Sequence, residues 1–413
     1  MFSVPFPPSE TDIGCSDGGV ELNAPIASPA PDPPCIIRHS RALSGFFVAL
    51  VTGVTWAGFT ELVKTADQSH NTSIQSGDIA SQSGDKFSQS ECTLKGAAGL
   101  TYFFTAWMLL AFPPYFIVNV LIRNRPVKNV VGESLAIFAG QTEQEGRNWT
   151  HVWKAALLLV TWTLAIYAYI QALARLNPAD VTSLYATNHS FVYMLSWIVL
   201  FEKFVAIRIL AMIFSITGIV LFAYVDAAGE LIWGVIIAVT SSSLTAIHKV
   251  LFSKFVGDAN VGQATLFLTC LGLLSVLLLW PFFTALQLTG AEAIDWSQAP
   301  WSTLCAAAAL LLVFHVLGVC AVRVTCKEAW GLGVALSIPL CAASDVVWGG
   351  KQYSGMKLAA FVLITLGLLL ILLPENWTQV IVRPFKKRKK GRQRTPCTSN
   401  HTLRGRLTMT TNM

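Results

Sequence analysis

The chain has 413 residues, of which 54% are hydrophobic and 13% are charged, with a formal net charge of +6. Soluble domains carry about 25% charged residues, and half that share cannot cover the surface of a protein of this size. The composition therefore argues against a soluble enzyme, a secreted disulfide scaffold and a disordered protein, and it indicates an integral membrane protein.

Ten apolar segments predict membrane-spanning helices, because a helix needs about 20 apolar residues to cross the hydrocarbon core of a bilayer. They lie near residues 43–64, 97–121, 155–174, 181–201, 205–225, 231–252, 262–286, 302–322, 329–349 and 356–373. An even number of spans puts both termini on the same side of the membrane. Lys and Arg residues are in excess on that side, which places both termini in the cytoplasm.

Polar segments flank and interrupt these spans. Residues 1–41 hold eight of the 18 prolines and predict a disordered cytoplasmic tail. Residues 378–413 form a second cytoplasmic tail, whose basic run is typical of contact with anionic lipid rather than with nucleic acid. Residues 65–95 are a polar insert on the opposite side of the membrane. The sequon Asn71-Thr72-Ser73 makes Asn71 a candidate glycosylation site there.

An internal sequence repeat divides the spans into two halves, residues 42–226 and 227–377. At an offset of 149 residues, Ala206–Ala211 aligns with Gly355–Ala360, and the aligned pairs include Gly218 with Gly367 and Asp226 with Glu375. Each half has five spans, and an odd number of spans inserts the second half upside down. Inverted repeats are typical of secondary transporters, with the substrate site near the midplane. Lys357 is an exception to the positive-inside pattern. The inversion explains it, because Lys357 aligns with Arg208 and lies on the opposite side of the membrane.

Ionisable residues within spans are functional candidates by default, and Asp345 is the strongest of them. It lies in the second half of the ninth span, without a basic neighbour in sequence. Helical spacing predicts that Ser337, Cys341, Ser344 and Trp348 share its face. This stripe would offer a carboxylate and an aromatic ring to a cationic substrate, or a carboxylate for proton coupling. The alternative is a buried Asp whose partners lie on another helix.

Further polar candidates lie in three other spans. In the fourth span, Tyr185 and His189 share a face, and His189 would either relay protons or bridge helices as a neutral group. In the sixth span, Thr245, His248 and Lys249 cluster, and Lys249 would either hold an anionic group or extend to the cytoplasmic interface. In the first span the candidates are Trp56 and Glu61.

Motifs for enzymatic chemistry are missing from the sequence. Gly349-Gly350-Lys351-Gln352 departs from the phosphate-binding loop at its last position, and neither HExxH nor GxSxG occurs. No Cys or His spacing fits a metal site. We therefore expect no enzymatic activity, no metal and no cofactor.

Between about residues 42 and 377 the chain resembles the drug/metabolite transporter superfamily, within it solute carrier family 35, subfamily F, branches three and four. The segments that carry the resemblance are 180–185, 195–200, 245–252, 336–339 and 373–377. The resemblance implies an all-α integral membrane protein with ten transmembrane helices in two inverted five-helix repeats. Spans 1, 3, 4, 6, 8 and 9 would line the path, with 5 and 10 at the periphery. The 65–95 insert, and His248 in place of an expected Tyr, depart from the family pattern.

The resemblance implies a multi-pass membrane secondary transporter that works by alternating access. Branches three and four are regarded as candidate thiamine transporters, and other family members exchange nucleotide sugars in the Golgi. Thiamine or another organic cation suits the residues, because Asp345 or Glu61 would offset its charge while Trp56, Tyr185 or Trp348 stacks on its rings.

Two alternatives stay open. A nucleotide-sugar antiporter of the Golgi or ER would need a basic cluster for the diphosphate, and Lys249 is the only basic residue well inside a span. A membrane receptor or scaffold that transports nothing is the other. The expected partners are a small solute and the lipid bilayer, with a homodimer as an open alternative and without nucleic acid. The plasma membrane and the Golgi both fit the sequence.

Overall fold

The computed structural model describes residues 35–79, 96–139, 148–201, 205–226, 231–257, 259–290, 299–320 and 327–373. The chain divides into two units, Met1–Ser40 and Arg41–Met413, and the helix packing described below belongs to the second. Residues 1–34 and 374–413, and residues 80–95 of the polar insert, lie outside the described ranges. The predictions for most of the two tails and for this half of the insert therefore remain predictions.

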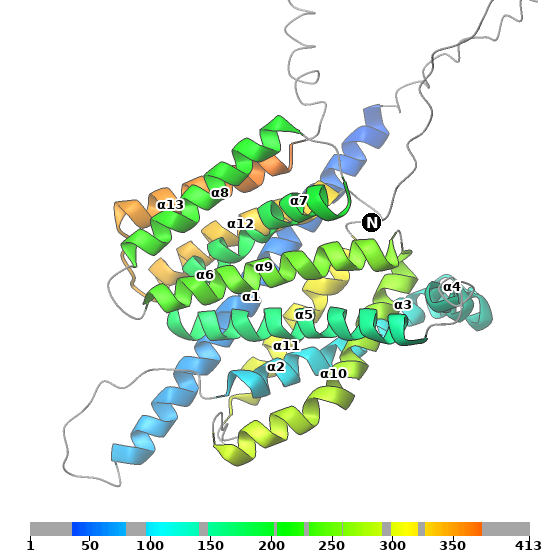
Figure 1. Ribbon diagram of the computed structural model, residues 1–413, viewed down its shortest axis with the longest axis horizontal. Helices are drawn as coiled ribbons and strands as arrows, with labels where there is room; N and C mark the ends of the chain where they lie inside the picture. Colours follow the sequence, from blue (N-terminus) through cyan, green and yellow to red (C-terminus); the bar gives the residue numbers. More distant parts are fainter. Residues whose placement is uncertain are drawn as a thin grey trace, which may run out of the picture. The chain divides into compact units, whose positions relative to one another are not determined.

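The described ranges form helices without strands (Figure 1). The helices are α1 (Cys35–Ile79), α2 (Ala97–Ala106), α3 (Phe112–Ile117), α4 (Val127–Ala139), α5 (Asn148–Arg175), α6 (Pro178–Ala186), α7 (Asn188–Val199), α8 (Ala206–Val225), α9 (Leu231–Val256), α10 (Val261–Thr289), α11 (Trp301–Cys320), α12 (Lys327–Val347) and α13 (Gly355–Ile371). A 3₁₀ turn, Trp107–Leu110, joins α2 to α3, and a π-helical turn, Val118–Ile122, follows α3.

Eight segments of the described chain are long and apolar enough to cross a membrane. They are Ser44–Asp67, Ala97–Ile122, Trp153–Arg175, Ala206–Val225, Leu231–Val256, Val261–Thr289, Trp301–Cys320 and Trp330–Val347. They coincide with all predicted spans except the fourth and the tenth. The tenth is α13, an apolar helix of 17 residues, so the count of ten is not confirmed. These helices support the composition-based prediction of a multi-pass membrane protein.

The predicted fourth span is not one continuous helix, because it is interrupted at Thr187 between α6 and α7. Here side chains compete for the carbonyls that would continue the helix. The Thr187 hydroxyl donates to the carbonyl of Leu184 at 2.6 Å, and the Asn188 amide donates to the carbonyl of Tyr185 at 2.6 Å. Thr187 Oγ1 also lies 2.9 Å from Ser242 Oγ of α9, which holds the break against a neighbouring helix.

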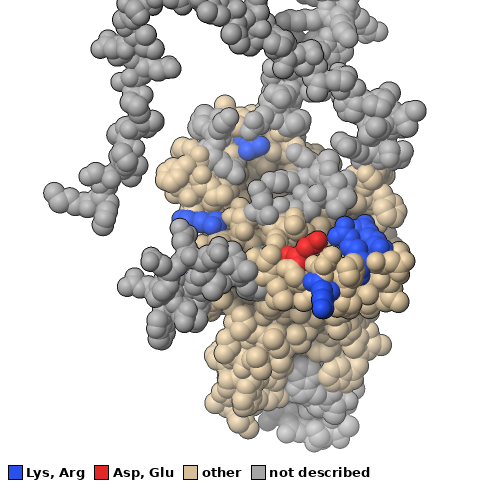
Figure 2. All heavy atoms as spheres, turned by 90° about the vertical axis from the view of Figure 1, so that its right-hand side faces the viewer, with Lys and Arg blue, Asp and Glu red and all other residues tan. Residues whose placement is uncertain are grey.

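Helix α4 lies in the segment between the second and third predicted spans. It follows Pro126 and packs against α10, where Gln263 donates to the carbonyl of Glu133 at 3.2 Å. Arg123, Arg125 and Lys128 are exposed in this region, and Figure 2 shows basic side chains gathered on the face that carries α4. This face belongs to the side on which the positive-inside pattern places the cytoplasm.

Helix α1 continues well beyond its apolar segment, to Ile79. The first half of the predicted polar insert is therefore helical. Asn71 lies in this extension, in a stretch whose side chains are not described, and its glycosylation remains a prediction.

Helices α8 and α13 pack closely through small residues. A Cβ added at Gly218 of α8 would collide with the Ile364 side chain of α13, and one added at Gly367 of α13 would lie 2.7 Å from Ser215 Oγ of α8. On the outward faces of the same helices, Val220 is 61% exposed and Val362 is 59% exposed. Such apolar surface suits lipid tails rather than water.

Candidate functional site

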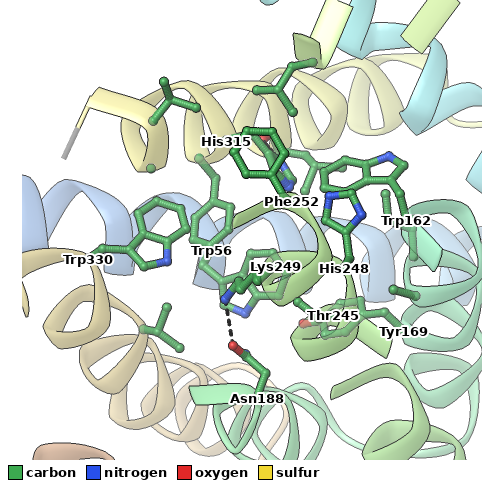
Figure 3. A pocket seen from close by; sticks show the side chains of 18 of the residues that line it. Trp56, Trp162, Tyr169, Asn188, Thr245, His248, Lys249, Phe252, His315 and Trp330 are labelled. Atoms are coloured by element: carbon green, nitrogen blue, oxygen red, sulfur yellow. Dashed lines mark hydrogen bonds between the residues drawn. The ribbon is translucent and has the colours of Figure 1, made fainter. Parts of the chain in front are cut away.

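A cavity of about 330 Å³ lies among the helices (Figure 3). Its lining comes from α1, α5, α6, α7, α9, α10, α11 and α12, and neither α8 nor α13 contributes a residue. These elements correspond to the six spans that the resemblance places along the path, together with α10. Small-molecule sites typically enclose about 300–1,000 Å³, so this cavity is at the small end of that range.

Aromatic rings form one wall of the cavity. Trp56 of α1 stacks on Tyr185 of α6, with ring centroids 4.6 Å apart and planes 18° apart. Phe314 of α11 lies 4.4 Å from the Trp56 ring and 4.3 Å from the ring of Trp330, which α12 supplies. Four helices thus hold one continuous aromatic surface. Such a surface can pack against a flat ring system.

A second aromatic group contains two histidines. The Trp162 ring of α5 lies 5.2 Å from the His248 ring and 4.7 Å from the His315 ring, as Figure 3 shows. His248 Nδ1 is 3.2 Å from the carbonyl oxygen of Leu158, and His315 Nδ1 is 2.8 Å from that of Leu311. Because a carbonyl oxygen only accepts, each Nδ1 carries a proton, and Nε2 is then an acceptor whenever the imidazole is neutral.

The lining also holds one ammonium group, that of Lys249. Its Nζ donates to Asn188 Oδ1 at 2.7 Å, across the space between α9 and α7 (Figure 3). The Lys249 side chain thus lines the cavity. No Asp or Glu belongs to the described lining. The indole Nε1 of Trp56 is buried without a hydrogen-bond partner among the described residues.

Five of the predicted site residues line this cavity: Trp56, Tyr185, Thr245, His248 and Lys249. The Thr245 hydroxyl donates to the carbonyl of Ser241 at 2.8 Å within α9, so its remaining capacity is that of an acceptor. The other predicted residues lie elsewhere. His189 is not part of the lining; its Nδ1 lies 3.2 Å from the carbonyl oxygen of Ala186, and its Nε2 is buried and unpartnered in the described part of the chain.

Asp345 is buried outside the cavity lining, and the expectation that it has no basic neighbour in sequence is wrong. Lys351 lies 3.2 Å from Asp345 Oδ1, while Asp345 Oδ2 accepts from the Tyr353 hydroxyl at 2.6 Å and from the Ala179 N–H at 3.1 Å. The chain turns back after α12 through Gly350, whose φ of 59° suits glycine, and this turn brings Lys351 to the carboxylate.

The predicted stripe along the ninth span is wrong at Trp348, which is 84% exposed. Helix α12 ends at Val347, so helical spacing does not extend to the next residue. Ser337 is buried and donates to the carbonyl of Val334 at 2.7 Å within the same helix. Ser344 hydrogen-bonds Glu61 of α1, so these two predicted residues contact each other instead of the cavity.

A second group of charges was not predicted as a site. Lys357 at the start of α13 lies 3.0 Å from Asp180 Oδ2 of α6 and 3.0 Å from Asp226 Oδ1 at the end of α8. The sequence held one signal of it, since Lys357 breaks the positive-inside pattern. Beside this group, burial and the Asp345 carboxylate raise the pKa of the Tyr353 hydroxyl. The hydroxyl therefore stays protonated and donates to Asp345.

Comparison with known proteins identifies the family, although no family model matches the chain. Human solute carrier family 35 member F3 is 32% identical over 358 residues, which are 85% of this chain and 78% of that protein. Mouse solute carrier family 35 member F4 is 35% identical over 365 residues, or 84% of this chain and 67% of that protein. One solved structure aligns with 79% of this chain at a TM-score of 0.46 and 15% identity, a similarity too low to establish a common fold.

These relatives are solute carriers, a class of transporters rather than enzymes. Their similarity extends over about 85% of this chain. The chain therefore belongs to solute carrier family 35, subfamily F, and is a multi-pass membrane transporter of solutes.

Proposed function

We propose that the protein is a secondary transporter that carries a small, flat organic solute through the cavity by alternating access. The observation that carries this proposal is the aromatic cavity itself, which is built from α1, α5, α6 and α7 of one half and from α9 to α12 of the other. A site between two halves can be exposed to either side of the membrane when the halves rock against each other.

Reciprocal packing of α8 and α13 supports two inverted five-helix repeats, with halves at 42–226 and 227–377. A Cβ at Gly218 would meet Ile364 and the carbonyl of Ala360, and one at Gly367 would meet Ser215 and the carbonyl of Ala211. The offset of 149 residues found in the sequence pairs all of these positions with one another. Such mutual contacts are what a two-fold relation between α8 and α13 requires. On this proposal α13 and the α6–α7 pair complete ten spans.

The charged groups lie at one end of the helices and support a closed state at that end. Asp180 is in the first turn of α6, Asp226 follows α8, and Lys357 is in the first turn of α13. The cavity instead reaches Val319 near the end of α11 and Trp330 near the start of α12. With cytoplasmic termini, we propose that this conformation is closed on the outer side.

Thiamine, or another flat organic cation, is the first candidate solute. The aromatic surface around Trp56 and Tyr185 supports stacking and cation–π contact with its rings. The carboxylates expected to offset its charge, Glu61 and Asp345, lie outside the described lining. The aromatic surface, rather than a carboxylate, would therefore select the cation.

A second candidate is a flat solute that carries an acceptor or an anionic group. Lys249 favours it, because its ammonium is a donor within the cavity lining. A nucleotide sugar is less well supported, since the cavity is small and holds a single ammonium where a diphosphate needs several donors.

Uptake into proteoliposomes tests the proposal. We expect saturable uptake of radiolabelled thiamine by the purified full chain, and counterflow when unlabelled thiamine is preloaded. A receptor that transports nothing would show no counterflow with any solute. Uptake equal to that of empty liposomes would remove thiamine, and the aromatic carboxylates and phosphates would be tested next.

Two lysine variants of α9 test whether the transported solute is anionic or cationic. Lys249→Met removes the ammonium from the cavity, whereas Lys254→Met removes an exposed ammonium from the last turn of the same helix. If the solute is anionic, uptake falls at least tenfold in Lys249→Met and stays unchanged in Lys254→Met, since charged hydrogen bonds contribute about 1.5–3 kcal/mol. A cationic solute predicts equal or faster uptake in Lys249→Met.

A further inference from the structure

Two buried carboxylates share one ammonium group. Asp180 Oδ2 and Asp226 Oδ1 each lie 3.0 Å from Lys357 Nζ. The two aspartates are 1% and 6% exposed. Because both ion pairs end on the same nitrogen, the two carboxylates lie side by side. We call these three residues the triad; they join α6, the end of α8 and α13.

With both carboxylates ionised, the triad has two negative charges and one positive charge, so one negative charge is not neutralised. Each carboxylate also has an unpaired oxygen: Asp180 Oδ1 and Asp226 Oδ2 are buried without a hydrogen-bond partner among the described residues. Burying an uncompensated carboxylate is costly, and so is leaving its oxygen unpaired. One proton bound to either carboxyl removes the excess charge and supplies an O–H donor between the two groups.

We propose that the triad binds one proton and that this proton is the coupling ion of transport, an inference that rests on the proposed function. The step is a simple protonation. A proton from one compartment binds a carboxylate oxygen of Asp180 or Asp226, the other carboxylate keeps its ion pair with Lys357, and the proton leaves to the opposite compartment. No electron or other group is transferred.

The surrounding charges single out the triad. At the same end of the helices Asp345 is balanced by Lys351, and both of its oxygens accept hydrogen bonds. Other titratable groups on neighbouring elements have hydrogen-bond partners of their own. Glu61 accepts from Ser344, Lys64 donates to the carbonyl of Leu173, Arg175 donates to Gln171, His189 contacts the carbonyl of Ala186, and Lys249 donates to Asn188. Asp180 and Asp226 alone combine burial, unequal charge and an unpartnered oxygen in the described chain.

Helix α6 connects the triad to the cavity. All nine of its residues are buried. Asp180 is in its first turn, Tyr185 in its last turn lines the cavity, and Asn188 just beyond it holds Lys249. When the triad loses its proton, repulsion between the two carboxylates favours separating α6 from α8. Movement of α6 displaces the Tyr185 ring and changes the wall that the solute contacts.

Infrared spectroscopy tests proton binding without any knowledge of the solute. The purified full chain is titrated with acid and base, and the carbonyl stretch of a protonated carboxylic acid is followed. We expect a buried-acid band in the wild type that is lost in Asp226→Asn or in Asp180→Asn and retained in Asp345→Asn, the matched control. A band that survives in both triad variants, or that the wild type never shows, overturns the proposal.

Transport supplies the second readout, with radiolabelled thiamine as the probe. An inward proton gradient should accelerate uptake by the wild type and by Asp345→Asn, and Asp226→Asn should take up thiamine at the same rate with and without the gradient. Acceleration that persists in Asp226→Asn overturns the coupling role. If no variant takes up thiamine, the thiamine assignment fails, and the infrared result still decides whether the triad binds a proton.

Correct folding is checked in the same samples. Each Asn variant keeps one carboxylate for Lys357 and is nearly equal in volume to the wild type, so a monodisperse protein is expected. Should Asp226→Asn fail to fold, Asp226→Glu keeps the charge and is expected to shift the midpoint of the buried-acid band. An unchanged midpoint in Asp226→Glu, with the band also retained in Asp180→Asn, contradicts the proposal.

Discussion

Replacing Lys357 with Met should destabilise the protein strongly, since it leaves two buried carboxylates without their shared cation. Each ion pair spans 3.0 Å, for which Coulomb's law gives roughly 5–6 kcal/mol at an effective dielectric constant of about 20. Much of this is offset by the desolvation of the ammonium. Removal of one partner from a buried ion pair typically costs about 3–5 kcal/mol, and we expect a loss of this size.

The matched comparison is Lys351→Met. Lys351 neutralises one carboxylate and its side chain is 31% exposed, against 13% for Lys357. The hydroxyl of Tyr353 and the N–H of Ala179 still bond Asp345 in that variant. A partly exposed pair contributes about 1 kcal/mol or less, so Lys351→Met should be the milder change.

Unfolding by sodium dodecyl sulfate in mixed micelles, followed by tryptophan fluorescence, measures the difference in unfolding free energy. Adding Asp180→Asn and Asp226→Asn to Lys357→Met should restore most of the lost stability, because the uncompensated charges are then gone. The reasoning is refuted if Lys357→Met unfolds within about 0.5 kcal/mol of the wild type, the scatter expected for an ordinary surface change. It is also refuted if the added Asn substitutions restore nothing.

Three further outcomes follow. Gly218→Ala should destabilise the protein by about 1–3 kcal/mol, because the added Cβ meets Ile364. Gly132→Ala in α4 meets no atom within 4 Å and should stabilise the protein by about 0.5–1 kcal/mol. Thermal unfolding in detergent compares the two variants, and equal shifts of the unfolding temperature would contradict the packing. Asn71→Gln should abolish a glycosidase-sensitive mass shift in protein made by eukaryotic cells, and a wild type without this shift would contradict glycosylation of the insert. Tyr185→Phe should retain thiamine uptake. Tyr185→Leu should reduce it at least twofold, because the lost ring contact contributes about 0.5–1.5 kcal/mol beyond buried area; equal uptake by the two variants would exclude ring stacking.

Hydropathy was sufficient to locate most of the helices, because a bilayer imposes a length and a composition that a single sequence displays. It failed at Thr187, where the break depends on hydroxyl and amide groups that bond locally and on Ser242 of another helix. It also failed at α4, a helix too short and too polar to register as a span. Both features depend on capping and packing, which average hydropathy does not measure.

The candidate site was predicted in part. Polar and aromatic side chains in the middle of long spans were predicted as site residues, and those of α1, α6 and α9 line the cavity. Asp345 was chosen by the same rule, but a turn at Gly350 returns Lys351 to it. Lys357 and its two carboxylates come from three separate helices, and no spacing within one segment reveals such a contact.

The interruption at Thr187 has a consequence for the energy of motion within the membrane. A continuous helix can bend sharply only by losing main-chain hydrogen bonds in hydrocarbon, each at a cost of several kcal/mol. Between α6 and α7, the carbonyls of Leu184 and Tyr185 are already bonded by the side chains of Thr187 and Asn188. A rotation of α6 at this point would weaken the main-chain bond from the Thr187 N–H to the Leu184 carbonyl, which is already long at 3.3 Å, while side-chain bonds worth about 1 kcal/mol each still cover the two carbonyls. The break thus serves as a low-cost pivot at the level of the cavity.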